Sequence, residues 1–406
     1  FMPAAGSSSS SNRGSVAMLE SAIDHLTAPP HNGRVHVFSY YPKTDKSVFP
    51  RPGVDVLNGT PANLAFKLAP LSFLYRLAKL FRLPLPDSFW GGEIGTLLET
   101  DVILLIGGTT FKDDKFYKVP WNVACVLPGI FLGKKQMMYS QTLGPFEHFF
   151  NRVGAKLCFS YVNTIVPRGE GSLKNVYKLG FPKARYYADS AFTLQVPGWV
   201  EAPLRERFGA IPEGKRVVGI SVNSIVEAEC KKLGIDHTAV WAAFIEWLRD
   251  QGYYIFMIPH SMRQNSKGRH NNDLWTVGEI MAALSSHEGI TVIDDPYSCQ
   301  ELRVVVGLTD YYVASRFHSM ISALCTHTPV LVFGWGFQKY REVMSEFELE
   351  DYCHDAADFS TEALIDGFQR LVADAGTIRE RIMRNLPHVQ ESSMQNHLEA
   401  LRLARD

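Results

Sequence analysis

The segment from Tyr311 to Val330, YYVASRFHSMISALCTHTPV, passes from an apolar strand pattern through a polar exit into a helix pattern. A strand that leads directly into a helix is the repeating unit of parallel α/β sheets. In such sheets ligands bind beyond the carboxyl ends of the strands, and anions gain from the dipole of the following helix. Arg316 and His318 occupy that position. The alternative is a surface arginine beside a histidine that caps the helix or packs in the core.

Eight further apolar runs have the same strand character, and helical patterns separate them. They are 35–39, 102–106, 136–139, 163–166, 217–222, 253–258, 290–293 and 330–333. This alternation predicts an α/β protein with parallel sheets. The stretch 196–214 is rich in proline and glycine and divides the strands into two sets, so we interpret it as an interdomain linker.

Composition excludes several functional classes. The chain has 406 residues, 46% of them hydrophobic, which suffices for two domains with separate cores. Lys plus Arg number 41 and Asp plus Glu 42, so no overall basic field calls for nucleic acid, and anion binding must be local. The six cysteines show neither paired nor zinc-like spacing, which predicts buried thiols and no metal site.

The segment 66–85, FKLAPLSFLYRLAKLFRLPL, carries Lys67, Arg76, Lys79 and Arg82 but no acidic residue. It fits a helix that packs on its own domain with a cationic outer face; the alternative is a helix that docks on a membrane surface. No stretch is long and apolar enough to span a bilayer. We expect a cytoplasmic protein, with peripheral membrane contact on the second interpretation. A Golgi-lumen location would require a eukaryotic source and a removed leader.

Polar residues follow other expected strands as well. His260 comes directly after 253–258, where it either faces the same crevice as His318 or forms a turn hydrogen bond. After 102–106, Gly107 and Gly108 admit close backbone approach, and Asp113 and Asp114 lie just beyond.

Two more cations and a polar loop complete the candidates. Arg168 follows 163–166, and Lys339 follows 330–333, although a solvated lysine is the simpler interpretation. Near the start, a serine run leads through Asn12 and Gly14 into a helix pattern. Free backbone N–H groups at that helix start could hold an anion, or the run is a serine linker.

Taken in order along nearly the whole chain, these motifs resemble the polysaccharide pyruvyl transferase family. The matching positions are Asn12 to Gly14, the Gly107-Gly108 loop, Arg168 with Ser172, Ala188 to Phe192, Pro259 to Ser261, Glu301, Arg316 to Ser319, Pro329 and Lys339. The chain departs from the usual family pattern at Thr109, Gly169 and Thr328, which bears on the acceptor and on the local loop shapes.

The resemblance implies a GT-B-like pair of Rossmann-type domains with the donor, phosphoenolpyruvate, in the cleft between them. We expect an N-terminal domain at 1–195 on the acceptor side, a linker at 196–209, a donor-side domain at 210–385, and a C-terminal helix at 386–406 that returns to the first domain. The activity implied is pyruvyl transfer to a sugar of a polysaccharide or of a lipid-linked precursor.

The resemblance carries Arg168, Arg316, His318 and Lys339 to donor contacts, and we add His260 and Ser319 to that site. Arginine forks suit the carboxylate and phosphate of the donor. His318 is the expected general acid, or else a phosphate ligand.

Asp113 or Asp114 would accept a proton from the sugar hydroxyl. Asn12, Gly14, Gly107 and Gly108 are assigned to the acceptor side or its loops. Phosphoenolpyruvate is a co-substrate, and no other cofactor is expected.

Two other functions remain open. A GT-B glycosyltransferase could use the same cations to hold the diphosphate of a nucleotide sugar. A glycan-binding protein without activity could share the scaffold, because fold does not fix function.

Overall fold

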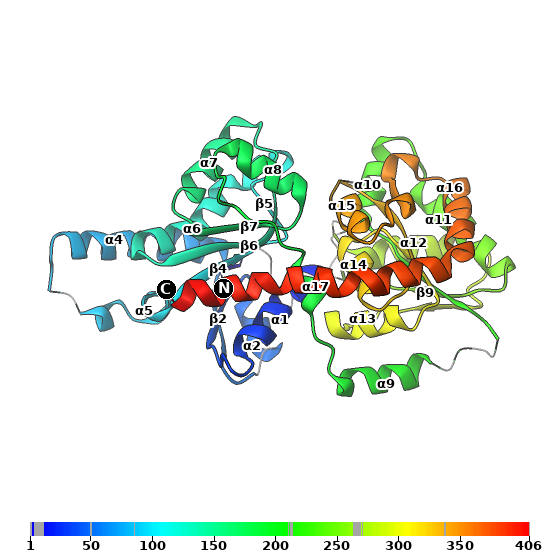
Figure 1. The fold of residues 1–406 in the computed structure, drawn as a ribbon, viewed down its shortest axis with the longest axis horizontal. Helices are drawn as coiled ribbons and strands as arrows, with labels where there is room; N and C mark the ends of the chain where they lie inside the picture. Colours follow the sequence, from blue (N-terminus) through cyan, green and yellow to red (C-terminus); the bar gives the residue numbers. More distant parts are fainter. Residues whose placement is uncertain are drawn as a thin grey trace. The chain divides into compact units, whose positions relative to one another are not determined.

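The computed structural model describes residues 2–3, 12–48, 51–84, 86–209, 211, 214–262, 269, 271–336 and 338–405 (Figure 1). The serine run before Asn12 and residue 85 lie outside these residues. The chain forms two compact units. The first contains Met18–Thr193 and Glu391–Asp406, and the second contains Leu194–Gln390 together with residues 12–17.

The first unit is built on parallel strands. β1 (Met2–Pro3), β4 (Val102–Ile106), β6 (Lys135–Leu143) and β5 (Thr109–Thr110) pair in that order, and β7 (Thr164–Pro167) also pairs with β6. β2 (Val35–Ser39) and β3 (Val54–Asn58) form a separate parallel pair. Apolar side chains of β4, β6 and β7 are buried in one core with those of the surrounding helices.

Along the chain the helices of this unit alternate with its strands, and the last two follow β7. They are α1 (Arg13–Thr27), α2 (Pro42–Val48), α3 (Pro61–Asn63), the π-helical turn η1 (Leu64–Leu68), α4 (Ala69–Leu80), η2 (Asp87–Trp90), α5 (Gly92–Glu99), η3 (Asp113–Lys118), α6 (Val119–Leu132), α7 (Phe149–Phe159), α8 (Glu170–Leu179) and η4 (Ser190–Thr193). The described residues contain no helix long and apolar enough to cross a membrane.

The second unit holds a six-stranded parallel sheet in the order β10-β9-β8-β11-β12-β13. Its strands are β8 (Val217–Ser221), β9 (Tyr254–Met257), β10 (Ile290–Val292), β11 (Tyr311–Ala314), β12 (Val330–Gly334) and β13 (Cys353–Asp355). Counted within the unit, this is the Rossmann order 3-2-1-4-5-6. The order reverses between β8 and β11, so the crevice beyond these two strands is where the fold binds ligands.

The crossover helices of the second unit cover both faces of its sheet, and α17 extends from it into the first unit. The elements are α9 (Gly198–Phe208), α10 (Ser224–Lys232), α11 (His237–Asp250), α12 (Asp273–Ala283), α13 (Cys299–Gly307), α14 (Phe317–Cys325), α15 (Gln338–Glu346), η5 (Glu350–Tyr352), η6 (Ala356–Asp358), α16 (Thr361–Ala373) and α17 (Ala375–Arg405).

Strand packing at the centre of this sheet is close. All four residues of β11 are buried, and they pair in register with β8 on one side. A Cβ on Gly219 of β8 would lie 2.5 Å from the Tyr312 ring, so glycine is required there. The large Tyr312 side chain therefore fills the space that a second side chain would take.

All nine predicted strands are present, and the parallel α/β class is confirmed. The pattern missed β3 and β13, as well as the two-residue strands β1 and β5. Among the described strands β3 pairs only with β2, and its Asp55 is half-exposed. β13 has three residues and ends the sheet order. Short edge strands of this kind carry little of the apolar pattern that identifies buried strands.

The residues expected to form a linker, 196–209, largely form helix α9, which packs against α13 within the second unit. The end of α17, Glu391–Asp406, belongs to the first unit. There Asn396 donates a hydrogen bond to the carbonyl of Ala188 at 2.9 Å.

Candidate functional site

A buried ion pair lies at the carboxyl ends of the central strands in the second unit. Arg316, the residue before α14, donates from Nε to Oδ2 of Asp273 at 2.9 Å and from Nη2 to Oδ1. The Asp273 side chain is 0% exposed. A carboxylate this deeply buried needs a matching charge, because removing it from water costs several kcal/mol.

Asp273 also joins the loops that follow β8 and β9. It accepts hydrogen bonds from the backbone N–H of Ser261 at 2.9 Å and of Ser224 at 3.3 Å. Arg316 in turn donates from Nη1 to Oδ1 of Asn271 at 2.8 Å. The pair therefore fixes three strand exits. No described residue accepts the second Nη1 hydrogen of Arg316.

His260 lies in this site as a neutral acceptor. Its Nδ1 is 3.0 Å from the carbonyl oxygen of Ile258, which can only accept, so Nδ1 carries the hydrogen. Burial, with smaller contributions from Arg316 and His318, lowers the pKa of His260 to about 4. Its Nε2 is buried without a hydrogen-bond partner among the described residues. The sequence placed His260 among the donor contacts, but a neutral ring with a lone pair suits a hydroxyl better than an anion.

His318 packs against the start of α1. A Cβ on Gly14 would lie 2.1 Å from His318 Nδ1 and 2.7 Å from its Cβ, so only glycine fits beside this ring. Asn12 holds the segment in place. Its Oδ1 accepts from the backbone N–H of Gly14 at 3.1 Å, and Asn12 pairs with Ser261 in an isolated antiparallel bridge.

The backbone N–H of Arg13 donates to the carbonyl of His260 at 3.0 Å, which continues this contact. The sequence predicted that Asn12 and Gly14 lie on the acceptor side or in its loops, and that role stays a prediction. Both residues belong to the second unit, where Asn12 pairs with Ser261 and Gly14 lies beside His318. A serine-rich approach to a helix gives no sign of which domain the helix start contacts.

Lys339 and Ser319 lie at the same end of the sheet. Lys339 Nζ is 5.5 Å from the centre of the Phe317 ring and 5.1 Å from that of Tyr340, which favours a cation. The Phe317 and His318 rings are 5.2 Å apart. Ser319 donates to the carbonyl of Arg316 at 2.8 Å, so its hydroxyl stabilises the first turn of α14.

The first unit contains a second buried arginine–aspartate pair. Arg168 donates from Nη1 to Asp189, from Nη2 to the carbonyl of Gly108 at 2.6 Å, and from Nε to Thr142 Oγ1 at 3.0 Å. These bonds connect the exits of β4, β6 and β7, with Gly107 in the same loop. The expectation that Arg168 and Arg316 contact one anion stays a prediction.

The two candidate bases of the first unit differ in their surroundings. Asp113 accepts from Asn151 Nδ2 and from the backbone N–H of Glu147, both at 2.7 Å. Its two oxygens therefore hold η3 to the start of α7. Asp114 is exposed and lies 3.8 Å from Lys112 Nζ, so it is the more accessible of the two.

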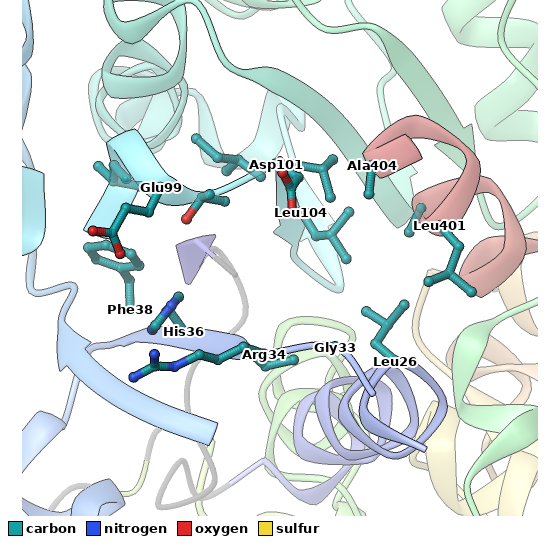
Figure 2. A pocket seen from close by; sticks show the side chains of 16 residues that line it. Leu26, Gly33, Arg34, His36, Phe38, Glu99, Asp101, Leu104, Leu401 and Ala404 are labelled. Atoms are coloured by element: carbon teal, nitrogen blue, oxygen red, sulfur yellow. The ribbon is translucent and has the colours of Figure 1, made fainter. Parts of the chain in front are cut away.

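A cavity of about 270 Å³ lies elsewhere in the first unit (Figure 2). It is lined by Arg34 and His36 at the start of β2, by Asp101 before β4, and by Leu401 of α17. These are the amino ends of the strands, whereas ligands of parallel sheets bind at the carboxyl ends. The cavity contains none of the residues that the sequence singled out.

Fold and strand ends together define an α/β protein of the GT-B-like class. Among solved structures, a putative UDP-N-acetylglucosamine 2-epimerase from Listeria monocytogenes matches with a TM-score of 0.56 at 13% identity, over 92% of this chain and 89% of that one. The UDP-GlcNAc 2-epimerase of Neisseria meningitidis bound to UDP-GlcNAc gives 0.53 at 12%, over 91% and 100%. Anabaena Alr3699/HepE in complex with UDP gives 0.56 at 13%, over 93% and 94%. At these identities the likeness shows the fold alone.

The model of the family named polysaccharide pyruvyl transferase matches residues 12–336. The chain belongs to the polysaccharide pyruvyl transferase family, as the order of its motifs indicated. The amylovoran biosynthesis protein AmsJ of Erwinia amylovora is 24% identical over 282 residues, which are 67% of this chain. The match spans 64% of the length of AmsJ.

Sequence reasoning missed the partners of the cations. Asp273 and Ser224 both accept hydrogen bonds from Arg316, yet neither was assigned a role. Ser224 follows the strand pattern 217–222 as directly as Arg316 follows β11, and that position was the available signal. Asp273 lies 43 residues before Arg316, so their pairing appears only in the fold.

We expect Arg316→Ala to lower the free energy of unfolding by about 3 to 5 kcal/mol, because it leaves Asp273 buried without a counterion. Adding Asp273→Ala should restore part of that loss, since the uncompensated charge is then gone. Urea titration of the two variants measures both effects. A double variant less stable than Arg316→Ala would contradict the assignment.

Stability should also fall as the pH is lowered from about 6.5 to about 4. In this window the unfolded chain protonates His260, whereas the folded chain, with its pKa at about 4, does not. The free energy of unfolding should therefore fall by up to about 3 kcal/mol across this window. Burial likewise lowers the pKa of His237 to about 4, so His237 makes the dependence of stability on pH steeper.

His260→Asn keeps a donor for the Ile258 carbonyl but cannot titrate. The slope of its unfolding free energy against pH should be smaller across the window, because this variant takes up about one proton fewer on unfolding. An unchanged slope would show that His260 is not the group responsible.

Proposed function

We propose that this chain transfers the pyruvyl group of phosphoenolpyruvate to a sugar of a polysaccharide or lipid-linked precursor and forms a pyruvate ketal. The observation that supports this proposal is the set of polar side chains at the carboxyl ends of β9, β11 and β12. Arg316 and Lys339 supply cations, His318 supplies a titratable ring, and His260 supplies a neutral acceptor. Family membership supports a transferase acting on such a substrate.

Donor binding would rest on Lys339, on the start of α14 and on part of Arg316. Asp273 already balances the charge of Arg316. Asn271 accepts one Nη1 hydrogen of Arg316, and the second Nη1 hydrogen could bind an oxygen of phosphoenolpyruvate. Lys339 is held over two aromatic rings at the same strand ends. The backbone N–H groups at the start of α14 add a partial positive charge.

The reaction needs a proton and two hydroxyls. A proton adds to the methylene carbon of the donor, and a sugar hydroxyl attacks the adjacent carbon and releases its own proton. Phosphate then leaves, and a second hydroxyl of the same sugar closes the ketal and releases its proton. One of the two hydroxyl protons restores the acid, and the other leaves with the phosphate. His318 would deliver the first proton, since a histidine can be an acid near neutral pH. His260 Nε2 would accept a hydrogen bond from a sugar hydroxyl, and Asp114 stays a candidate base.

Donor-dependent thermal stabilisation tests the proposal, together with phosphate release in the presence of sugar acceptors. Stabilisation by phosphoenolpyruvate, with phosphate released only when a sugar is present, is the expected result. Stabilisation by UDP-sugars alone would favour a glycosyltransferase. Stabilisation by glycans, with no response to either donor, would favour a binding protein.

We expect His318→Gln and Arg316→Lys to separate catalysis from donor binding. His318→Gln should bind the donor but lose turnover by roughly 10²- to 10⁴-fold, the range for a general acid. Arg316→Lys keeps a counterion for Asp273 but loses the planar fork, so it should weaken donor affinity with a smaller effect on turnover of bound donor. Donor titration and single-turnover phosphate release measure the two effects. Normal turnover by His318→Gln would assign the proton to another group.

Gly14→Ala should lower turnover by about a hundredfold, because the added Cβ displaces the His318 ring by more than an ångström. The matched control is Gly278→Ala in α12, where nothing lies within 4 Å of the added Cβ. That variant should retain full activity. Equal activity of the two variants would show that His318 needs no support from α1.

A further inference from the structure

Helix α4 has two apolar faces. Its inner face packs into the core of the first unit through Leu71 and Tyr75 and through the buried Ala78. Large apolar side chains on other positions of η1, α4 and the residue after α4 point to solvent. Phe66 is 84% exposed, Leu80 71% and Phe81 69%, and Phe73 and Leu74 are nearly half-exposed.

The outer apolar residues are spaced as a second helical stripe. Phe66, Phe73 and Leu80 recur at intervals of seven, which is close to two turns of a helix. A helix in water needs only one apolar stripe to pack on its domain. A second stripe of Phe and Leu costs free energy in solution unless something covers it.

Helix α7 repeats the pattern. Both α4 and α7 pack against α6, and Phe73 of α4 contacts Phe131 of α6 with ring centres 5.3 Å apart. On α7, Phe149 and Phe150 are more than 60% exposed, and Val153 and Leu157 are nearly half-exposed. Two helices flanking the same third helix therefore both present uncovered apolar side chains.

Cations accompany both stripes. Arg76, Lys79 and Arg82 on and after α4 are exposed, as are Arg152 and Lys156 on α7. Neither helix contains an acidic residue. Lys67 is excluded from this group, because Glu93 pairs with it at 2.9 Å.

We propose that η1, α4 and α7 form a docking surface for an anionic lipid bilayer. Exposed Phe and Leu side chains would enter the interface between headgroups and acyl chains, while the arginines and lysines meet lipid phosphates. A second copy of the same surface would bring cations against cations. The charge thus favours a negatively charged partner, and the row of Phe and Leu favours one with an apolar interior.

Co-sedimentation with vesicles tests the surface directly and does not depend on any enzymatic activity. The wild-type chain should sediment with vesicles of equal parts phosphatidylcholine and phosphatidylglycerol, and much less with phosphatidylcholine alone. Raising the salt from about 0.1 M to about 1 M should release it, because the Debye length falls from about 10 Å to about 3 Å.

Reversing Arg76, Lys79 and Arg82 to Glu should reduce partitioning onto the anionic vesicles by about a hundredfold or more. The matched control reverses Lys178, Lys183 and Lys231, which are exposed on other surfaces and give the same change in net charge. The control should bind as the wild type does. Equal losses in the two triple variants would show a general charge effect and overturn the proposal.

Replacing Phe66, Leu80 and Phe81 with Ser removes apolar area and keeps every charge. Binding to the anionic vesicles should fall at least tenfold, with an unchanged thermal unfolding midpoint. Unimpaired binding by this variant would overturn the apolar part of the proposal. A lipid-free dimer that this variant dissociates would identify the surface as an interface between copies and overturn the proposal as a whole.

Discussion

The buried pair of Arg316 and Asp273 is the interaction on which the site depends. Loops that leave parallel strands carry backbone N–H groups that need acceptors. Asp273 accepts from two such loops, and this is possible only because Arg316 balances its charge in a dry environment. In the first unit Asp189 balances the charge of Arg168, and Arg168 itself donates to the Gly108 carbonyl and to Thr142 at the strand ends. Each unit thus uses one internal salt bridge to fix the ends of its central strands.

This arrangement gives the two buried arginines a structural role in addition to the ligand-binding role that the sequence suggested. Arg168 and Arg316 follow strands, as anion-binding residues do, and the family resemblance assigned both to donor contacts. Their forks are largely occupied by aspartate and backbone carbonyls. An arginine that first holds the loops in place can still present a remaining N–H to a ligand. Its position is then set before the ligand arrives, which lowers the ordering cost of binding.

The sequence predicted the fold class well, because it follows from one pattern: an apolar strand, a polar exit and a helix. The same pattern placed the candidate site residues at strand ends, and their functional role stays a prediction. Strands buried on both faces, such as β11 and β12, give continuous apolar runs. The partners of each cation could not be predicted in the same way. Asn12 and Gly14 contact Ser261 and His318 across most of the chain, and local residue patterns contain no information about such pairings.

The way the chain is divided between the units has a consequence for folding during synthesis. Residues 12–17 belong to the second unit, while Glu391–Asp406 complete the first. Domains commonly fold one after the other as the ribosome releases them. Here the first unit lacks the donor of the Asn396 bond to Ala188 until 208 further residues have been synthesised. The start of α1 likewise lacks its contact with His318 until that residue has been synthesised. Both units should therefore complete their folding late and together, and slowly, because these contacts join residues far apart in the sequence.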